Sequence, residues 1–427
     1  MFKREKNKYL NGVLPMFLIT FSIGAVYCWT LFKDHVNEYT GFSRSVTEWC
    51  FSLAIFCLGM SSAIGGKIVE KNPRKSAFLT FIFFTTGWLM TGIGIQIKNP
   101  IITILGFGVV QGIGLGLGYI TPIKTLMIWF ADRRGFAAGL TIAGFGIAGV
   151  IANPIIGFLL ESGLKVYTVF YVLTGIYAVA LFIASRLLYR PEFSVPEGTV
   201  TMKAGEFIKE RRFILLWLVV FLNITCGLAL ISQEKQLYNA IGVANMGLVV
   251  LLCSINAVSN VVGRISLASW QDKLKTKHTP YYIMAVMSLL VCFIAAINQN
   301  WLSTTFLMIF VVQFFFGVGF GCMPNILHQN YGIHQLSTVH GLLLSAWAFA
   351  GLAGNQFASF VLNDGLMRQA LRLGADPAGC LIDHLTNYTQ SILFAILGSL
   401  FTIMLIILLI WNKVRLHSAD QMIKCES

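Results

Sequence analysis

The chain has 427 residues, of which 56% are hydrophobic and only 11% are charged, whereas soluble domains carry roughly 25% charged residues. This composition excludes a soluble globular protein and indicates a protein that spans a membrane. The net charge of +13 does not require nucleic acid as a partner, because Lys and Arg concentrate in the cytoplasmic loops of membrane proteins.

Twelve apolar segments are long enough to cross a bilayer, which takes about 20 helical residues. In chain order they cover approximately residues 10–32, 46–66, 76–96, 101–127, 135–160, 166–188, 213–236, 243–269, 280–298, 302–327, 338–362 and 388–411. The first follows a basic N-terminus, as in a signal peptide, but it is long enough to span and no small-residue cleavage site ends it. We therefore expect a retained first helix and an all-α integral membrane protein.

The distribution of the 31 Lys and Arg residues predicts the orientation. With the N-terminus inside, 22 of them fall in cytoplasmic segments, 7 in outer segments and 2 within the spans, in agreement with the positive-inside rule. We therefore expect both termini to be cytoplasmic, in a multi-pass protein of the cell membrane, either inner or plasma. We expect the chain to act as a monomer in the lipid bilayer, without nucleic acid.

A polar stretch at 189–212, the longest on the cytoplasmic side, divides the twelve spans into two sets of six. The predicted parts are an N-terminal six-helix bundle (1–188), a cytoplasmic linker (189–212), a C-terminal six-helix bundle (213–411) and a cytoplasmic tail (412–427). The halves repeat at a separation of 202 residues, since Pro122 corresponds to Pro324 and Glu70 to Asp272. Parallel six-helix repeats that hold a solute near the midplane between them are typical of secondary transporters.

The glycine-rich segment GIGLGLG at 112–118 could be read as a phosphate-binding loop, which requires a preceding strand and a following helix. Here a long apolar run precedes it without a polar break, and similar glycines recur in the tenth span. We therefore expect two rows of helix-packing positions, at which a neighbouring backbone approaches closely. Gly108, Gly112 and Gly116 form one row, and Gly114 and Gly118 form the other.

Catalytic and cofactor-binding patterns are missing from the sequence. The nine cysteines are scattered without metal-ligand spacing, and the spans lack clustered titratable groups. We expect no enzyme activity, no catalytic residue, no metal and no cofactor.

The loop after the second span, GKIVEKNPRK at 66–75, resembles the signature G-x-x-x-D-R-x-G-R-K of the major facilitator superfamily. The corresponding residues are Gly66, Glu70, Lys71, Arg74 and Lys75, with Glu70 in place of aspartate, Lys71 in place of arginine and Pro73 in place of the second glycine. A second copy, ASWQDKLKTK at 268–277, contains Asp272. We expect a gating clasp, in which an acid at a helix end faces basic residues and separates from them when the bundle rocks. Plain positive-inside charge is the alternative.

Three further segments carry a closer resemblance. GYITPIKTLMIWFADRRGFAAGLTIAGFGIAG at 118–149, GAVYCWTLF in the first span and NVVGRISLASWQDK at 260–273 are similar to the oxalate/formate antiporter family of that superfamily. The resemblance implies the major facilitator fold of two six-helix bundles. It also implies a carrier or exchanger of small carboxylates.

Two basic residues, Lys124 and Arg264, lie within the predicted spans, where a charge is expensive and by default indicates function. Arg264 shares one helix face with Asn260, four residues earlier, and Asn256, eight residues earlier. A guanidinium offers a planar fork that fits a carboxylate, and the resemblance implies that an arginine of this helix binds substrate. The alternative is an arginine that ties helix ends together near Asp272. For Lys124 we expect a side chain that snorkels to the inner interface.

The resemblance implies further substrate contacts at Tyr27 and Tyr119, although ordinary core packing explains any single aromatic residue nearly as well. In the eleventh span the oxalate transporter has a lysine, and Trp347 stands at the position we align with it. One fixed charge instead of two favours a monocarboxylate such as pyruvate, lactate or formate over oxalate, because the second carboxylate would be buried without a partner. Gln111 and Gln313, paired by the repeat, are either polar substrate contacts or interhelical hydrogen bonds.

The acidic residues predict the mode of transport. All eighteen lie in loops or near span ends, with Glu48 and Glu234 the deepest, so we expect exchange or uniport by alternating access rather than a dedicated proton relay. The sequence leaves open whether a proton travels with the substrate. Two alternatives remain open: a membrane sensor built on a transporter fold, and a carrier of another small solute such as a sugar or a drug. The role of the outer loop at 363–387 is left undecided.

Overall fold

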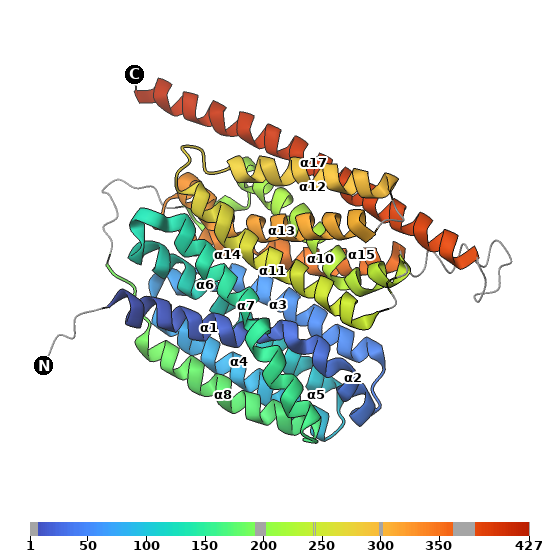
Figure 1. The fold of residues 1–427 in the computed structure, drawn as a ribbon. Coiled ribbons are helices and arrows are strands. Elements are labelled where there is room, and N and C mark those ends of the chain that lie inside the picture. The colour runs from blue at the N-terminus through green and yellow to red at the C-terminus, as the bar shows by residue number, and fades with distance from the viewer. Residues whose placement is uncertain are drawn as a thin grey trace, which may run out of the picture. The chain divides into compact units, whose positions relative to one another are not determined.

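The computed structural model describes residues 7–192, 202–241, 243, 245–298, 302–361 and 381–426. Within these ranges every regular element is a helix (Figure 1). Twelve helical segments of the described chain are long and apolar enough to span a membrane, which confirms the prediction. They are Tyr9–Cys28, Ser45–Lys71, Pro73–Gln96, Pro100–Trp129, Ala131–Glu161, Val166–Leu187, Arg211–Ile231, Leu251–Gln271, Thr279–Ile297, Leu302–Tyr331, Leu336–Gly354 and Gln390–Leu416.

The helices follow one another with short connections. The first part of the chain contains η1 (Tyr9–Val13), α1 (Leu14–Gly24), η2 (Ala25–Cys28), α2 (Trp29–Thr40), α3 (Arg44–Lys71), α4 (Pro73–Gln96), α5 (Pro100–Ile104), η3 (Leu105–Val110), α6 (Gln111–Trp129), η4 (Ala131–Arg133), α7 (Arg134–Glu161) and α8 (Val166–Leu187). The second part contains α9 (Ala204–Phe207), α10 (Arg211–Ala240), α11 (Met246–Gln271), α12 (Thr279–Ile297), α13 (Leu302–Tyr331), α14 (Leu336–Leu343), α15 (Ser345–Ser359) and α17 (Leu381–Glu426).

The last helix is longer than the sequence suggested. Helix α17 already begins at Leu381 and continues to Glu426, through the segment predicted as a separate tail. Residues 381–387, assigned to the outer loop, are therefore helical, while residues 363–380 of that loop lie outside the described residues. An apolar run marks the buried length of a helix, and polar extensions at either end leave no hydropathy signal.

Contacts between residues divide the chain into two compact units. Unit 1 comprises Met1–Phe207, Ala268–Lys273 and Gly321–Ala348, and unit 2 comprises Ile208–Leu267, Leu274–Phe320 and Phe349–Ser427. Unit 1 thus contains the first six spans together with the last residues of the eighth span, the last third of the tenth and most of the eleventh. The predicted division at 189–212 into two six-helix bundles stays a prediction.

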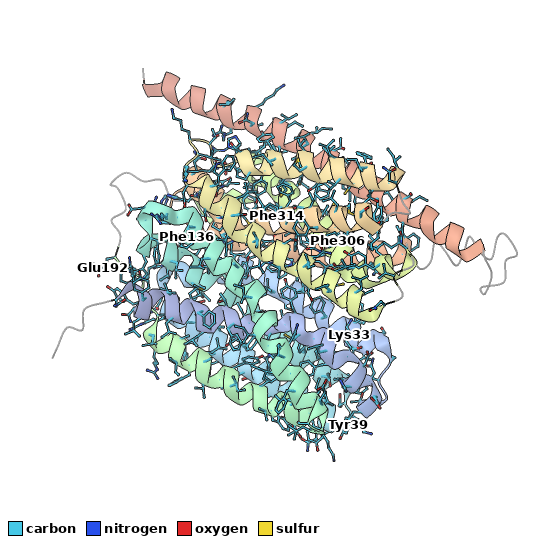
Figure 2. All side chains as sticks on the ribbon, viewed as in Figure 1. Lys33, Tyr39, Phe136, Glu192, Phe306 and Phe314 are labelled. Atoms are coloured by element: carbon cyan, nitrogen blue, oxygen red, sulfur yellow. The ribbon has the colours of Figure 1, made fainter. Side chains whose placement is uncertain are left out.

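Within unit 1, the helices α1, α4 and α8 run side by side (Figure 1). The labelled side chains of this unit mark the two ends of its helices, with Lys33 and Tyr39 at one end and Phe136 and Glu192 at the other (Figure 2). The apolar middles of the helices lie between these ends, as a bilayer requires.

Helix α6 packs on two neighbours through the two predicted glycine rows. A Cβ atom at Gly112 would lie 2.6 Å from the Cβ of Cys57, and Gly116 likewise faces α3, as does Gly108 in the preceding η3. A Cβ atom at Gly114 would lie 2.6 Å from the backbone nitrogen of Phe84 on α4, and Gly118 faces the same helix. The interpretation of these glycines as helix-packing positions is therefore confirmed.

In unit 2, helices α11 and α13 approach each other equally closely. A Cβ atom at Gly317 of α13 would overlap the carbonyl oxygen of Asn260, and one at Gly263 of α11 would overlap that of Phe314. Both helices therefore meet backbone to backbone, next to the residues that the sequence assigns to substrate binding.

We expect Gly317→Ala to destabilise the protein by about 1–3 kcal/mol, because the added methyl group has no space and the backbone must shift. Gly175→Ala on α8 is the matched control, since nothing lies within 4 Å of the Cβ that it would add. That change should be neutral or stabilise by up to about 1 kcal/mol, because alanine favours the helix. Thermal unfolding of the purified variants in detergent measures both, and equal midpoints would contradict the packing described for α11 and α13.

Candidate functional site

The polar residues of α11 form a connected row in unit 2. The Nε atom of Arg264 donates a hydrogen bond to Oδ1 of Asn260 at 2.9 Å, and Nδ2 of Asn260 donates to the carbonyl oxygen of Gln313 at 3.0 Å. The structure therefore brings these three predicted site residues together. The side-chain nitrogen of Gln313 is buried and has no hydrogen-bond partner among the described residues.

The charge of Arg264 lies inside the protein. Its side chain is only 3% exposed, and the guanidinium carbon is 5.7 Å from the centre of the Phe320 ring. The ring attracts the cation through its π face, while the bond from Nε to Asn260 holds the plane of the guanidinium. A carboxylate is a ligand whose two oxygens fit the planar fork of an arginine side chain.

Three predicted aromatic residues of unit 1 come together around a fourth. The ring centres of Tyr119 and Trp347 are 5.3 Å apart in an edge-to-face arrangement. Phe145 lies 5.4 Å from Tyr119, 6.1 Å from Trp347 and 5.2 Å from Tyr27. Phe145 was not predicted, because no pattern distinguishes it among 34 phenylalanines. We call these four residues the aromatic cluster.

His340 of α14 lies beside the aromatic cluster, with its ring centre 6.3 Å from that of Tyr119. It is only 1% exposed, and its Nε2 atom has no hydrogen-bond partner among the described residues. Gln111 is also fully buried, at the start of α6, where its Cα lies 2.6 Å from the position that a Cβ of Gly87 on α4 would occupy. The structure thus packs the backbone of Gln111 on α4.

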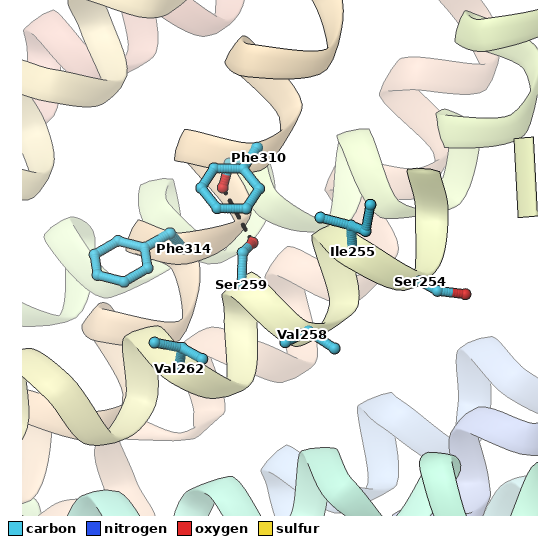
Figure 3. A pocket seen from close by; sticks show the side chains of 7 residues that line it. All are labelled: Ser254, Ile255, Val258, Ser259, Val262, Phe310 and Phe314. Carbon is cyan, nitrogen blue, oxygen red and sulfur yellow. Dashed lines mark hydrogen bonds between the residues drawn. The ribbon is translucent and has the colours of Figure 1, made fainter. Parts of the chain in front are cut away.

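The groove between α11 and α13 in Figure 3 is a different feature from the polar row. It has a volume of about 370 Å³, and its lining consists of Ser254, Ile255, Val258, Ser259, Val262, Phe310 and Phe314. The hydroxyl of Ser259 already donates to the carbonyl oxygen of Phe310 at 3.1 Å. Val258 and Val262 are two positions away from Asn260, which places them on the opposite side of the helix. This apolar groove offers no charge to an anion.

Glu70 at the end of α3 forms the predicted type of contact with partners that the sequence did not reveal. It makes an ion pair with Lys124 of α6. Its Oε1 atom also accepts hydrogen bonds from the backbone nitrogens of Ser337 at 2.5 Å and Thr338 at 3.3 Å, at the start of α14. A carboxylate at this place satisfies N–H groups that have no partner within the helix.

Lys124 is only 1% exposed, and it also donates to the carbonyl oxygen of His334 at 3.1 Å. The expectation that its side chain snorkels to the interface is therefore wrong. Snorkelling is favourable when the alternative is an unpaired buried charge, but here Glu70 provides a carboxylate inside the protein. The rarity of a basic residue within a span was the available signal.

Asp272 performs the same role for a second helix. Its two carboxylate oxygens accept hydrogen bonds from the backbone nitrogens of Gly135 at 2.7 Å and Phe136 at 3.0 Å, at the start of α7. Glu70 and Asp272 are separated by 202 residues, and the backbone donors Gly135 and Ser337 are separated by the same number. The earlier acid bonds to the later donor, and the later acid bonds to the earlier donor. Each half of the repeat therefore supplies one acidic cap and one capped helix.

The other residues of the loop signature do not share the contacts of Glu70 described above. Gly66 packs against α14, where a Cβ would lie 2.6 Å from the carbonyl oxygen of Ser337. Lys71 and Lys75 are exposed, and Arg74 donates to two backbone carbonyls near the end of α8 at 2.7 and 3.2 Å.

Arg190 also reaches this region, where it donates to the backbone carbonyls of Val69, at 3.0 Å, and Glu70. Burial lowers the pKa of the Arg190 guanidinium, and the nearby Glu70 carboxylate opposes that shift. Arginine stays charged at physiological pH in either case, so this contact remains cationic.

Several known proteins are similar to this chain. The chain is 26% identical over 363 residues to the oxalate:formate antiporter of Oxalobacter formigenes, a match that covers 82% of this chain and 83% of the relative. It is also 26% identical over 195 residues to apicoplast pyruvate carrier 1 of Toxoplasma gondii, covering 35% of each chain. The solved proton:xylose symporter XylE has the same fold, with a TM-score of 0.65 at 15% identity and coverage of 94% of both chains.

The profile of the Major Facilitator Superfamily matches residues 13–355. Members of this superfamily are transporters rather than enzymes, and they move small solutes across a lipid bilayer through two sets of six helices. With twelve spans, the matching fold and this profile, the chain belongs to the Major Facilitator Superfamily.

Proposed function

We propose that the chain transports small monocarboxylates, such as pyruvate, lactate or formate, by alternating access, and that Arg264 binds the carboxylate. The buried guanidinium beside Asn260 and Phe320 is the observation that carries this proposal. A charge at such depth is costly unless a ligand or partner uses it, and its planar fork fits a carboxylate. The cell membrane is the proposed location, with both termini in the cytoplasm.

The charge of the substrate follows from the residues of the eleventh span. This chain is similar to an oxalate:formate antiporter. In the family of that antiporter we align a lysine of the eleventh span with Trp347. Trp347 is 1% exposed and packs against Tyr119 and Phe145, so this position offers an aromatic surface instead of a charge. A second carboxylate would be buried there at a cost of several kcal/mol, which favours a substrate with one.

Transport into liposomes tests the substrate. Purified protein is reconstituted into liposomes preloaded with unlabelled pyruvate, lactate, formate or oxalate, and uptake of the matching labelled anion is measured. We expect uptake of at least one monocarboxylate, with oxalate slower by about tenfold or more, the effect of one unpaired charge. Comparable rates for oxalate would contradict the monocarboxylate assignment. Binding of an anion without uptake would indicate a sensor, and no response to any anion would point to another solute.

Trp347→Lys tests the aligned position directly. We expect the added ammonium to raise the rate for oxalate relative to pyruvate by about tenfold, because the second carboxylate then has a partner. Trp347→Phe is the control, since it changes the size of the side chain without adding a charge. An unchanged oxalate-to-pyruvate ratio in a variant that still transports pyruvate would contradict a role for this position in specificity.

A further inference from the structure

A buried carboxyl group in unit 2 lies close to the polar row of α11. Glu234 of α10 is 9% exposed, and it accepts a hydrogen bond from Nδ2 of Asn256. The same nitrogen lies 2.6 Å from the hydroxyl of Tyr238, and both Asn256 and Tyr238 are fully buried. We call Glu234, Tyr238 and Asn256 the carboxyl cluster.

The carboxyl cluster can accommodate both protonation states of Glu234. A charged carboxylate only accepts hydrogen bonds, and Asn256 provides the N–H that it needs. The Oδ1 atom of Asn256 is buried and has no partner among the described residues. A rotation of the amide would present this oxygen to the O–H of a protonated carboxyl, since the two orientations of an amide have almost the same shape.

The side chains of Asn256 and Cys253 donate hydrogen bonds that favour the charged form of Glu234, but burial opposes this form more strongly. Tyr238 and Cys253 are the titratable side chains described beside it, and helix α17 contributes the neutral Gln390, bonded to the backbone of Leu237 on α10. Among the described side chains, no cation pairs with Glu234; those of Lys235, Asp383 and His384 lie outside the description. Burial removes the water that stabilises a carboxylate, which favours proton uptake.

Asn256, Asn260 and Arg264 connect this carboxyl group with the proposed anion site. They lie on one face of α11, and Asn256 is eight residues before Arg264, or about 12 Å along the helix. Since Glu234 contacts Asn256, a charged Glu234 and Arg264 attract each other over a separation of about this order. An anion bound to Arg264 cancels the attraction, which would raise the affinity of Glu234 for a proton by about tenfold at an effective dielectric constant of about 20.

We propose that Glu234 takes up a proton when a monocarboxylate binds to Arg264, so that the chain carries one proton with each anion. The inference rests on the proposed function, and it replaces the expectation of exchange or uniport with coupled symport. The sequence placed Glu234 near the outer end of the seventh span and gave no sign that it is buried against α11.

An imposed pH gradient tests this inference. Liposomes with an alkaline interior and an acidic exterior are used to measure accumulation of labelled pyruvate by wild type, Glu234→Gln and Glu48→Gln. We expect wild type and Glu48→Gln, whose side chain is exposed, to accumulate pyruvate by about tenfold per pH unit, the ratio that one proton per anion gives. Glu234→Gln should lose this accumulation, and Glu234→Asp should recover part of it.

A second measurement separates this inference from the proposed function. Exchange of labelled for unlabelled pyruvate, at equal pH on both sides, requires the anion site but no net proton movement. Glu234→Gln should retain this exchange, which also shows that the variant is folded. Accumulation retained in Glu234→Gln would overturn the inference alone, as would accumulation driven by a sodium gradient instead of a pH gradient. Failure of wild type to exchange any monocarboxylate would overturn the proposed function.

Discussion

Replacement of Arg264 by alanine is expected to reduce pyruvate uptake by about 100-fold or more. The removal of one partner from a buried, hydrogen-bonded charge pair typically costs about 2–5 kcal/mol, and the substrate carboxylate would lose its only proposed cation. Arg264→Lys should also lose most activity, because an ammonium keeps the charge but lacks the planar fork and the Nε–H that bonds to Asn260. Uptake of labelled pyruvate into liposomes measures both variants.

The controls for Arg264 separate charge from position. Lys273→Ala removes a basic residue just beyond the end of α11 that is exposed, and we expect it to keep nearly full activity. Asn260→Ala removes the hydrogen bond that orients the guanidinium and should have an intermediate effect. If Arg264→Ala reached the level of the Lys273→Ala control, the assignment of Arg264 to the carboxylate would be wrong, although the fold and the family would be unaffected.

The sequence was sufficient to predict the spans and several packing positions, because both depend on local patterns. An apolar length of about 20 residues identifies a span wherever it occurs, and small residues four apart identify a close helix contact. The row of Asn256, Asn260 and Arg264 follows from helical periodicity in the same way. These features need no knowledge of which helices become neighbours.

Pairings between distant helices could not be predicted in this way. Lys124 and Glu70 are 54 residues apart, and hydropathy gives neither the rotation of α6 nor its position beside α3. The burial of Glu234 against Asn256 and the place of Phe145 among the tyrosines depend on the same unknown rotations. A charged residue within a span indicates that it has a partner or a function. Only the fold identifies that partner or function.

The repeat is the exception, because it connects local patterns with long-range contacts. Glu70 caps α14 and Asp272 caps α7, and the separation of 202 residues holds for the acids and for the capped positions alike. A duplicated sequence therefore predicted which acids correspond. It did not predict that each acid caps a helix from the other half of the repeat. Two positions that match in the repeat can bond within their own half or to the other half, and the sequence does not distinguish these cases.

The largest effect on stability is expected from Glu70→Ala. Lys124 would remain buried without the carboxylate of Glu70, and the removal of one member of a buried ion pair costs about 3–5 kcal/mol. Asp272→Ala is the matched comparison, because it removes the corresponding helix cap at the start of α7, and it should cost about 1–2 kcal/mol, the usual value of a cap. Thermal unfolding in detergent compares the two.

The double variant Glu70→Ala with Lys124→Met distinguishes the ion pair from the cap. Methionine has a similar length to the lysine stem and no charge, so the double variant should regain most of the stability lost in Glu70→Ala, apart from the share of about 1–2 kcal/mol due to the cap of α14. Such recovery would locate the main cost in the buried ammonium. If Lys124→Met brought no recovery, Glu70 would stabilise the protein mainly through its hydrogen bonds to the N–H groups of α14. Glu70 and Asp272 would then act in the same way, each as the cap of one helix.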